Sequence, residues 1–239
     1  MYTSEIAKNV GVHPNTVRLY EEWHYISPVP RQPNGYRIYS EIHVLQMTIA
    51  RLAFKQEFIQ NNLRKKATKI VRLSGQEAFF DSLRAAESYL LFLQSEYHYT
   101  VKSIETVDLL LQNQPFSANV YSHQEAAAHL QLTQETLRNW ERNDLYAVRR
   151  TSQNRRIYAE SDIQKLLIIR TLRTAHLSIT SIAHLFRELE LPLGKDVFAI
   201  ISSAKFTEDF SHVTDDLLNN LKIAMKDVES IIAILKKLQ

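Results

Sequence analysis

The chain carries one sequence pattern twice, at positions about 120 residues apart in its 239 residues. Each copy has a small alanine, then a Thr-apolar-Arg segment followed by an aromatic residue and a glutamate, and ends after a polar turn on Arg-Ile-Tyr. The corresponding pairs are Ala7 and Ala127, Val10 and Leu130, Val12 and Leu132, Thr16 and Thr136, Val17 and Leu137, Arg18 and Arg138, Tyr20 and Trp140, Glu21 and Glu141, Arg37 and Arg156, Ile38 and Ile157, and Tyr39 and Tyr158. Self-similarity at a nearly constant offset indicates two copies of one structural module.

The composition favours a globular protein rich in long helices. Apolar residues make up 45% of the chain, which is enough for a hydrophobic core, and 4 Gly and 6 Pro give few breaks. No apolar run approaches the ~20 residues of a membrane span. The first residues do not resemble a signal peptide, and the absence of cysteine excludes disulfides and thiolate metal sites. We therefore predict a cytoplasmic, nucleoid-associated protein that makes no contact with a membrane.

The sequence lacks the motifs that would indicate an enzyme. It has neither a glycine-rich phosphate loop nor a nucleophile elbow. The nine histidines are scattered, and none lies three or four residues from another, as a helical metal site would require. We predict no catalytic residue, no metal site and no cofactor.

The start of the first copy predicts two short helices joined by a tight turn. In residues 3–10, Ile6, Ala7 and Val10 share one helical face, and Gly11 ends the helix. His13 then stands at a cap position, and the following proline suits the first position of the next helix. Two short helices around a glycine-containing turn are typical of a helix-turn-helix.

The second copy repeats this pattern with a stronger cap. Ala126, Ala127 and Leu130 form the buried face of its first helix. Thr133 is a better N-cap than histidine, and Glu135 lies in the first turn, where negative charge is favourable.

A polar segment follows the second helix of each copy, at residues 31–39 and 149–158. Asn34-Gly35 is a strong hairpin-turn signal, and residues 36–39 alternate as a strand does. Each segment therefore predicts a β-wing. Ser40 and Ser161 are expected to begin the next helices.

With these residues the chain resembles the winged-helix DNA-binding domain of MerR-type transcription regulators. The first copy reads Thr-Val-Arg-Leu-Tyr-Glu and then Asn-Gly-Tyr-Arg-Ile-Tyr, which matches that family closely. The second departs from it, because Asn139 replaces a tyrosine, Trp140 replaces the next aromatic residue, and Arg155 replaces the wing tyrosine. Residues 177–182 also resemble the start of the family's fourth helix. The resemblance implies binding to double-stranded DNA.

The candidate DNA-binding residues lie in the recognition helices and wings. Arginine binds guanine edges and phosphates, and a recognition helix fits the major groove. The net charge is only +3, but arginines cluster at equivalent places in both copies. The candidates are His13, Asn15, Thr16, Arg18, Tyr20, Arg31, Tyr36 and Arg37 in the first copy, and Thr133, Gln134, Glu135, Thr136, Arg138, Asn139, Arg149, Arg150, Arg155 and Arg156 in the second.

Several of these positions have an alternative, structural interpretation. Arg18 and Arg138 could pair with Glu21 and Glu141 one helical turn away instead of reaching DNA. The aromatic residue before each glutamate could be half buried in the core. The Ile-Tyr pair that ends each copy is expected to pack in the core.

Two long apolar seams at heptad spacing follow the two copies. The first comprises Phe79, Leu83, Ala86, Leu90, Leu93, Tyr97, Thr100, Ile104, Val107 and Leu111, and the second Phe210, Thr214, Leu217, Leu221, Ala224, Val228, Ile231, Leu235 and Leu238. Seams of this length need a partner, because exposed they would aggregate. We expect an intramolecular antiparallel pair of coiled-coil helices, which makes the monomer a pseudo-dimer, with a homodimer of full chains as the alternative.

The expected fold is mainly α. The predicted parts are a first winged domain at 1–75, a long helix at 76–113, a linker at 114–120, a second winged domain at 121–191, a short helical insert at 192–206 and a C-terminal coiled-coil helix at 207–239.

Three functions fit this organisation. The first is a sequence-specific transcription regulator on an asymmetric inverted-repeat operator, where the family resemblance implies bending or untwisting of promoter DNA, with RNA polymerase as a possible partner. The second is an architectural or chromosome-anchoring DNA-binding protein. The third is an adaptor whose coiled coil binds a protein or a small apolar effector. Aromatic residues that could line an effector pocket, or simply form core, are Phe79, Phe80, Tyr89, Phe92, Tyr97, Tyr99, Phe116, Phe198 and Phe206.

Overall fold

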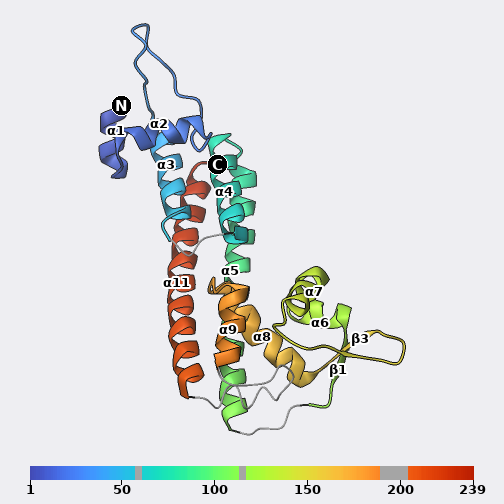
Figure 1. Cartoon of the computed structure of the whole chain (residues 1–239). Coiled ribbons are helices and arrows are strands. Elements are labelled where there is room, and N and C mark those ends of the chain that lie inside the picture. Colours follow the sequence, from blue (N-terminus) through green and yellow to red (C-terminus); the bar gives the residue numbers. More distant parts are fainter. Residues whose placement is uncertain (57–60, 113–116, 189–203) are drawn as a thin grey trace. The chain divides into compact units, whose positions relative to one another are not determined.

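The computed structural model describes residues 1–56, 61–112, 117–188 and 204–239, and it confirms a mainly helical protein (Figure 1). The chain divides into two compact units. The first unit comprises Met1–Ser95 and Asn220–Gln239, and the second comprises Glu96–Asn219. Each unit therefore combines residues from both halves of the sequence. Among the described helices, none has the length and apolar character needed to cross a membrane.

In the first unit, helix α1 (Thr3–Val10) begins and ends where the sequence predicts, and α2 (Pro14–Glu22) begins where the sequence predicts. Gly11 has φ of 67°, a left-handed conformation that favours glycine, and it ends α1. The His13 ring accepts a hydrogen bond from the backbone N–H of Asn15 at 3.2 Å. This bond satisfies one of the free N–H groups at the start of α2.

The second unit contains the corresponding helices α6 (His123–His129) and α7 (Gln134–Arg142). The Thr133 hydroxyl caps α7 by accepting a hydrogen bond from the Thr136 N–H at 3.0 Å, as predicted. The first turn of α6 is capped in the same way by Ser122.

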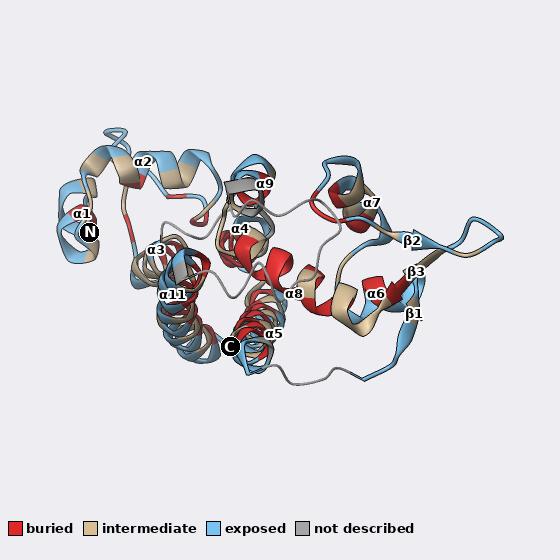
Figure 2. Ribbon diagram, turned by 60° about the horizontal axis from the view of Figure 1, so that its bottom comes forward, coloured by how far each residue is buried: buried red, intermediate tan, exposed pale blue. Residues whose placement is uncertain are grey.

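The predicted wing of the second unit contains a small antiparallel sheet. Strands β1 (Val120–Ser122), β2 (Arg149–Arg150) and β3 (Arg156–Ala159) lie in the order β1-β3-β2. The residue expected to end the linker, Val120, therefore begins a strand, while residues 113–116 of that linker lie outside the described residues. The exposed loop between β2 and β3 extends from this sheet (Figure 2).

The predicted strand at residues 36–39 of the first wing is wrong. In this fully described segment, strand pairing is limited to one isolated bridge between Arg31 and Arg37. Ile38 donates its N–H to the Pro30 carbonyl at 2.8 Å, but Pro30 has no N–H with which to return the bond. Proline in the incoming half of the hairpin therefore prevents a regular ladder.

The next helices are α3 (Glu41–Ala53) and α8 (Glu160–Thr174). Ser40, predicted to begin α3, is its N-cap, and the helix begins one residue later at Glu41. The predicted start of α8 at Ser161 is wrong, because the helix begins one residue earlier after Ala159. The Asp162 carboxylate accepts the Ala159 N–H at 2.8 Å, so an acidic third residue takes the place of a capping side chain.

Each unit has its own hydrophobic core. The core of the first unit lies beneath α1, α2 and α3 and contains Ile6, Ala7, Val17, Ile26, Val29, Tyr39 and Met47. In the second unit α8 is buried along most of its length (Figure 2). Its core includes Ala126, Ala127, Leu130, Leu137, Trp140, Tyr158, Phe206 and Phe210. Tyr39 and Tyr158 are buried, as expected, whereas Ile38 and Ile157 are only partly buried.

Helix α4 (Asn61–Gly75) follows α3 in the first unit, and α9 (Ile179–Glu188) follows α8 in the second. Gln46 is fully buried in α3 and links two segments. It accepts the Ser27 N–H at 2.8 Å and donates to the Ser74 carbonyl at 2.7 Å. These bonds hold the end of α4 close to the segment after α2.

The long helices are α5 (Phe79–Leu111) and α11 (Ala204–Lys237). The predicted buried seam of α5 is wrong at its end, where Leu111 is 38% exposed. It also differs at three inner positions, where Tyr89, Glu96 and Ser103 are buried while their successors Leu90, Tyr97 and Ile104 are only partly buried. The α11 seam is buried as predicted, except for Leu238, which follows the helix. Most of the predicted insert at 192–206 lies outside the described residues.

Candidate DNA-binding surfaces

The candidate recognition helix of the first unit, α2, presents most of its surface to solvent. In this fully described helix Val17 is the buried anchor. The candidates Asn15 and Arg18 are exposed, and His13 is exposed at the cap, while Thr16 and Tyr20 are half buried. The Arg18 guanidinium donates to the Asn15 side-chain oxygen at 3.0 Å. An amide neighbour leaves the positive charge of this arginine uncompensated.

The candidate recognition helix of the second unit, α7, differs at the position equivalent to Asn15. There Glu135 pairs with Arg138 at 3.2 Å and with Arg142 at 2.5 Å. The hydrogen bonds from Arg142 and Arg138 lower the pKa of Glu135. The candidates Thr133, Gln134 and Asn139 are exposed and Thr136 is half buried. The charge of Arg138 is therefore partly compensated within the helix, unlike that of its counterpart in α2.

Arg142 was missed in the sequence analysis. It is exposed and lies four residues after Arg138, on the same face of α7. Because the equivalent residue of the first copy is Glu22, comparison of the two copies gave no signal for it. The spacing along α7 alone would have indicated this residue.

Equivalent ion pairs tie each wing to its recognition helix. Arg37 Nε lies 2.5 Å from Glu21 Oε2 in the first unit, and Arg156 Nε lies 2.7 Å from Glu141 Oε2 in the second. Glu141 also pairs with Arg150 at 2.8 Å. These side chains are only 20–36% exposed, so the pairs hold the wing at a set position relative to the helix.

These pairs bear on the alternative in which Arg18 and Arg138 bind Glu21 and Glu141. Neither glutamate binds the arginine of its own recognition helix, because each is occupied by a wing arginine. The signal for this pairing was present in the sequence, since both copies keep a glutamate in the helix and an arginine in the wing. It was missed because the two residues are far apart in sequence.

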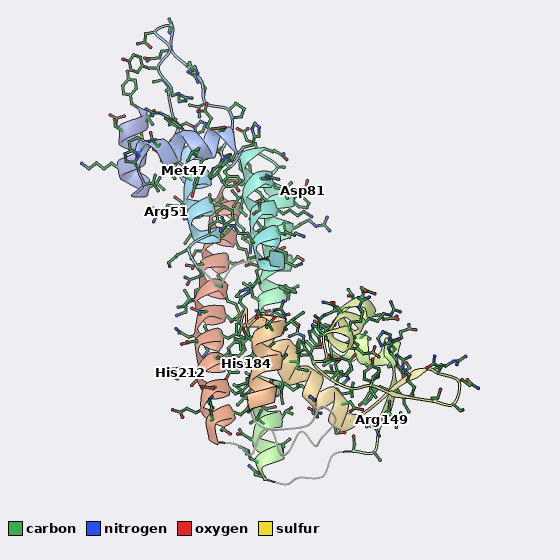
Figure 3. All side chains as sticks on the ribbon, in the orientation of Figure 1. Met47, Arg51, Asp81, Arg149, His184 and His212 are labelled. Carbon is green, nitrogen blue, oxygen red and sulfur yellow. The ribbon has the colours of Figure 1, made fainter. Side chains whose placement is uncertain are left out.

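The remaining wing candidates project into solvent. Arg31, Arg149 and Arg155 are exposed, and Tyr36 is 63% exposed. Arg149 lies in strand β2 and pairs with Asp162 at 3.0 Å (Figure 3). Within each unit the wing arginines and the recognition helix are thus brought together, with exposed cations beyond the ion-paired ones.

The aromatic residues of the two recognition helices have different environments. Tyr20 is half buried in a cluster with Trp23 and Tyr25, and burial raises the pKa of the Tyr20 hydroxyl. Trp23 itself is 47% exposed, whereas Trp140 is only 3% exposed. Trp140 is therefore a core residue, which agrees with the interpretation that the aromatic residue before the glutamate packs in the core.

No group of three or more His, Cys, Asp or Glu residues suited to a metal ion occurs in the part of the chain that the structure describes. Of the aromatic residues considered for an effector pocket, Tyr89 and Phe206 are buried. Phe206 stacks on Phe210, with ring centroids 5.6 Å apart. Phe116 and Phe198 lie outside the described residues.

Glu141 should make the second unit sensitive to acid. Burial raises the pKa of this carboxyl, but hydrogen bonds from Arg156 and Arg150 outweigh burial and leave the pKa below its usual value. A carboxyl whose pKa is lower in the folded state stabilises the fold above its unfolded pKa, and this contribution is lost as the pH falls through the folded value. We expect Glu141→Gln to lower the free energy of unfolding by about 1 kcal/mol near neutral pH.

Urea denaturation of wild type and Glu141→Gln at a series of pH values tests this expectation. The difference between the two proteins should shrink as the pH falls through the lowered pKa of the Glu141 carboxyl, because the wild-type carboxyl becomes protonated there. A difference that stays constant with pH would contradict the role of the ion pairs.

Capped pairs of short helices followed by arginine-rich loops are the arrangement of a helix-turn-helix regulator. The model of the MerR HTH family of regulatory proteins matches residues 1–63 and 121–189, which is more than half of the chain, and the chain belongs to this family. It is a transcription regulator and not an enzyme.

Curated relatives support this assignment over parts of the chain. The HTH-type transcriptional regulator CueR of Yersinia pestis is 27% identical over 111 residues, or 40% of this chain and 80% of that protein. CueR of Salmonella typhi and CueR of Escherichia coli O157:H7 are each 38% identical over 53 residues, or 22% of this chain. Those matches cover only 38% and 39% of the two relatives. No solved structure matches the chain significantly.

Proposed function

We propose that this MerR-family regulator binds double-stranded DNA as a single-chain pseudo-dimer. Two winged helix-turn-helix modules, within residues 1–75 and 121–191, occupy the two halves of one operator. The regulator acts on transcription from the promoter that contains this operator. The proposal rests on the duplicated module together with the long helix that each module contacts.

The observation that carries the proposal is that each module contacts the long helix that follows the other module, besides the one that follows itself. In the first unit, Lys55 after α3 pairs with Asp227 of α11 at 3.1 Å. In the second unit, Gln164 of α8 accepts a hydrogen bond from Thr106 of α5 at 2.9 Å. Each module thus contacts the long helix that follows the other module in sequence. Two separate chains would make such contacts across a dimer interface, and here one chain supplies both halves.

The two modules are expected to prefer different base sequences. Equivalent exposed positions of α2 and α7 carry Asn15 and Glu135, and Leu19 and Asn139. Base edges in the major groove are distinguished by the hydrogen-bonding groups of such side chains. The operator should therefore be an inverted repeat with unequal halves.

The family resemblance extends the proposal beyond recognition. Bending or untwisting of promoter DNA would cost a few kcal/mol, which the protein–DNA contacts must supply. Such distortion would act on a promoter that RNA polymerase also occupies, and the proposed location is the cytoplasm, on the nucleoid. A small apolar effector remains part of the proposal without an assigned site.

Selection of bound DNA from a random library tests the proposed function. If the protein is a sequence-specific regulator, we expect enrichment of a motif with two unequal, inverted halves. Broad occupancy without a motif would instead support an architectural role. An absence of enrichment would support an adaptor that acts through its helices.

Exchange of the residues at positions 15 and 135 should shift affinity between the modules. Glu135→Asn removes a carboxylate that binds Arg138 and would repel DNA phosphates, so it should strengthen binding at the α7 half-site about threefold. Asn15→Glu should weaken the α2 half-site by a similar factor. The check is the affinity for operators with one half-site scrambled, at a fixed salt concentration. Unchanged affinity in both variants would exclude these positions from the DNA interface.

A further inference from the structure

Arg170 of α8 is a buried arginine that joins three segments of the second unit. Its guanidinium makes two hydrogen bonds to the Glu96 carboxylate of α5, at 2.6 and 3.2 Å. Its Nε donates to the Leu130 carbonyl in the turn between α6 and α7, at 2.9 Å. Arg170 is 5% exposed and Glu96 is 6% exposed. One side chain therefore links the long helix to the helix-turn-helix turn.

Neighbouring residues strengthen the same link. The Tyr99 ring lies 4.1 Å from the centre of the Arg170 guanidinium, and its hydroxyl donates to the His129 carbonyl at 3.0 Å. Thr174 donates to Glu96 at 3.1 Å. The part of α5 in this unit thus contacts the turn through both Arg170 and Tyr99, and it lies beside α8 (Figure 1).

The first unit has the equivalent arginine, but different residues contact the turn and the carboxylate of the long helix. Arg51 of α3 occupies the position of Arg170 in the repeat and donates to the Gly11 carbonyl at 2.6 Å. The α11 carboxylate of Asp227 is bound instead by Lys55 and Gln56, at 3.1 and 3.3 Å. In the first unit, unlike the second, the arginine at the turn does not itself reach the carboxylate of the long helix.

We propose that Arg170 is a positioning residue that makes the placement of the second recognition helix depend on α5. A buried arginine with bidentate carboxylate bonds has little freedom to move, because any displacement leaves a buried charge uncompensated. Displacement of α5 relative to α8 therefore moves the turn that leads into α7. The first recognition helix lacks this single-residue link and responds less. The inference rests on the proposed function, in which each recognition helix binds its own half-site.

The test compares half-site affinities of the full chain. Removing only one partner would leave a buried charge, so the informative variant is the double replacement Glu96→Leu with Arg170→Met, which removes both charges and is expected to fold. We expect it to lose about tenfold affinity at the α7 half-site, with less than a twofold loss at the α2 half-site. Arg173→Met is the matched control, since Arg173 lies on α8 but donates to the Leu177 carbonyl.

A second variant keeps the test decisive if the double variant does not fold. Tyr99→Phe removes only the hydroxyl that reaches the His129 carbonyl, and it should weaken the α7 half-site about twofold or more. If the double variant folds, wild-type affinity at the α7 half-site, or an equal loss at both half-sites, overturns the inference. If it does not fold, the same results for Tyr99→Phe overturn it. A wild-type protein without two distinguishable half-sites would instead refute the proposed function.

Discussion

Arg138→Ala is expected to weaken DNA binding by about 1–3 kcal/mol at the half-site bound by α7, while leaving the other half-site unchanged. Arg18→Ala should have the reciprocal effect at the half-site bound by α2. The reason is that both arginines project from recognition helices that belong to different units. Because Arg138 already pairs with Glu135 and Arg18 contacts a neutral amide, the loss should be larger for Arg18.

The measurement is binding to three operators, the intact one and two in which one half is scrambled. Arg84→Ala provides a control, because it removes one exposed positive charge of α5 outside the recognition helices and wings. If Arg18→Ala and Arg138→Ala relaxed sequence preference in the same half of the operator, one module would be reading DNA and the other would have another function.

Trp140→Ala is expected to lower the free energy of unfolding by about 3–5 kcal/mol. Trp140 is 3% exposed in the core of the second unit, so its removal leaves a large cavity beneath α7. Trp23→Ala is the matched replacement in the first unit, where the side chain is 47% exposed. It should cost less than about 1 kcal/mol.

Urea denaturation followed by circular dichroism compares the two tryptophan variants. Trp140→Ala should unfold at a clearly lower urea concentration, and the loss should concentrate in the second unit. Amide hydrogen exchange locates the loss, because the second unit should exchange faster than the first. Similar midpoints for the two variants would mean that Trp140 does not anchor α7 to the core.

The local structure of the modules could be predicted because short-range chemistry determines it. Gly11 ends α1 through its left-handed conformation, and Thr133 caps α7 through its own hydroxyl. The turn at Asn34-Gly35 forms as expected, but the ladder beside it does not, because the preceding prolines lack N–H groups. Local sequence predicts turns and caps more reliably than the pairing between strands.

The interior of α5 shows why packing was harder to predict. A heptad pattern placed Leu90, Tyr97 and Ile104 in the seam, but the buried positions are Tyr89, Glu96 and Ser103. Glu96 is buried because Arg170, which is distant in sequence, satisfies its charge. A sequence pattern that scores burial by apolarity cannot detect a buried carboxylate whose partner lies on another helix.

The candidate DNA-binding residues, too, could be predicted from the sequence only in part. Sequence comparison of the two copies selected arginines of the candidate recognition helices and wings, since equivalent positions repeat. The comparison did not assign Glu21 and Glu141 to the wing arginines, because the two residues of each pair are far apart in sequence. The repeat also concealed Arg142, which has an acidic counterpart in the first copy.

The number of chains bound to one operator tests the central claim most directly. Native mass spectrometry of the purified protein with a DNA duplex that carries both selected half-sites gives this stoichiometry. The single-chain pseudo-dimer predicts one chain of 27.8 kDa per duplex, with both half-sites protected in a footprint of the same complex. Two chains per duplex, or protection of one half-site by a single chain, would contradict it.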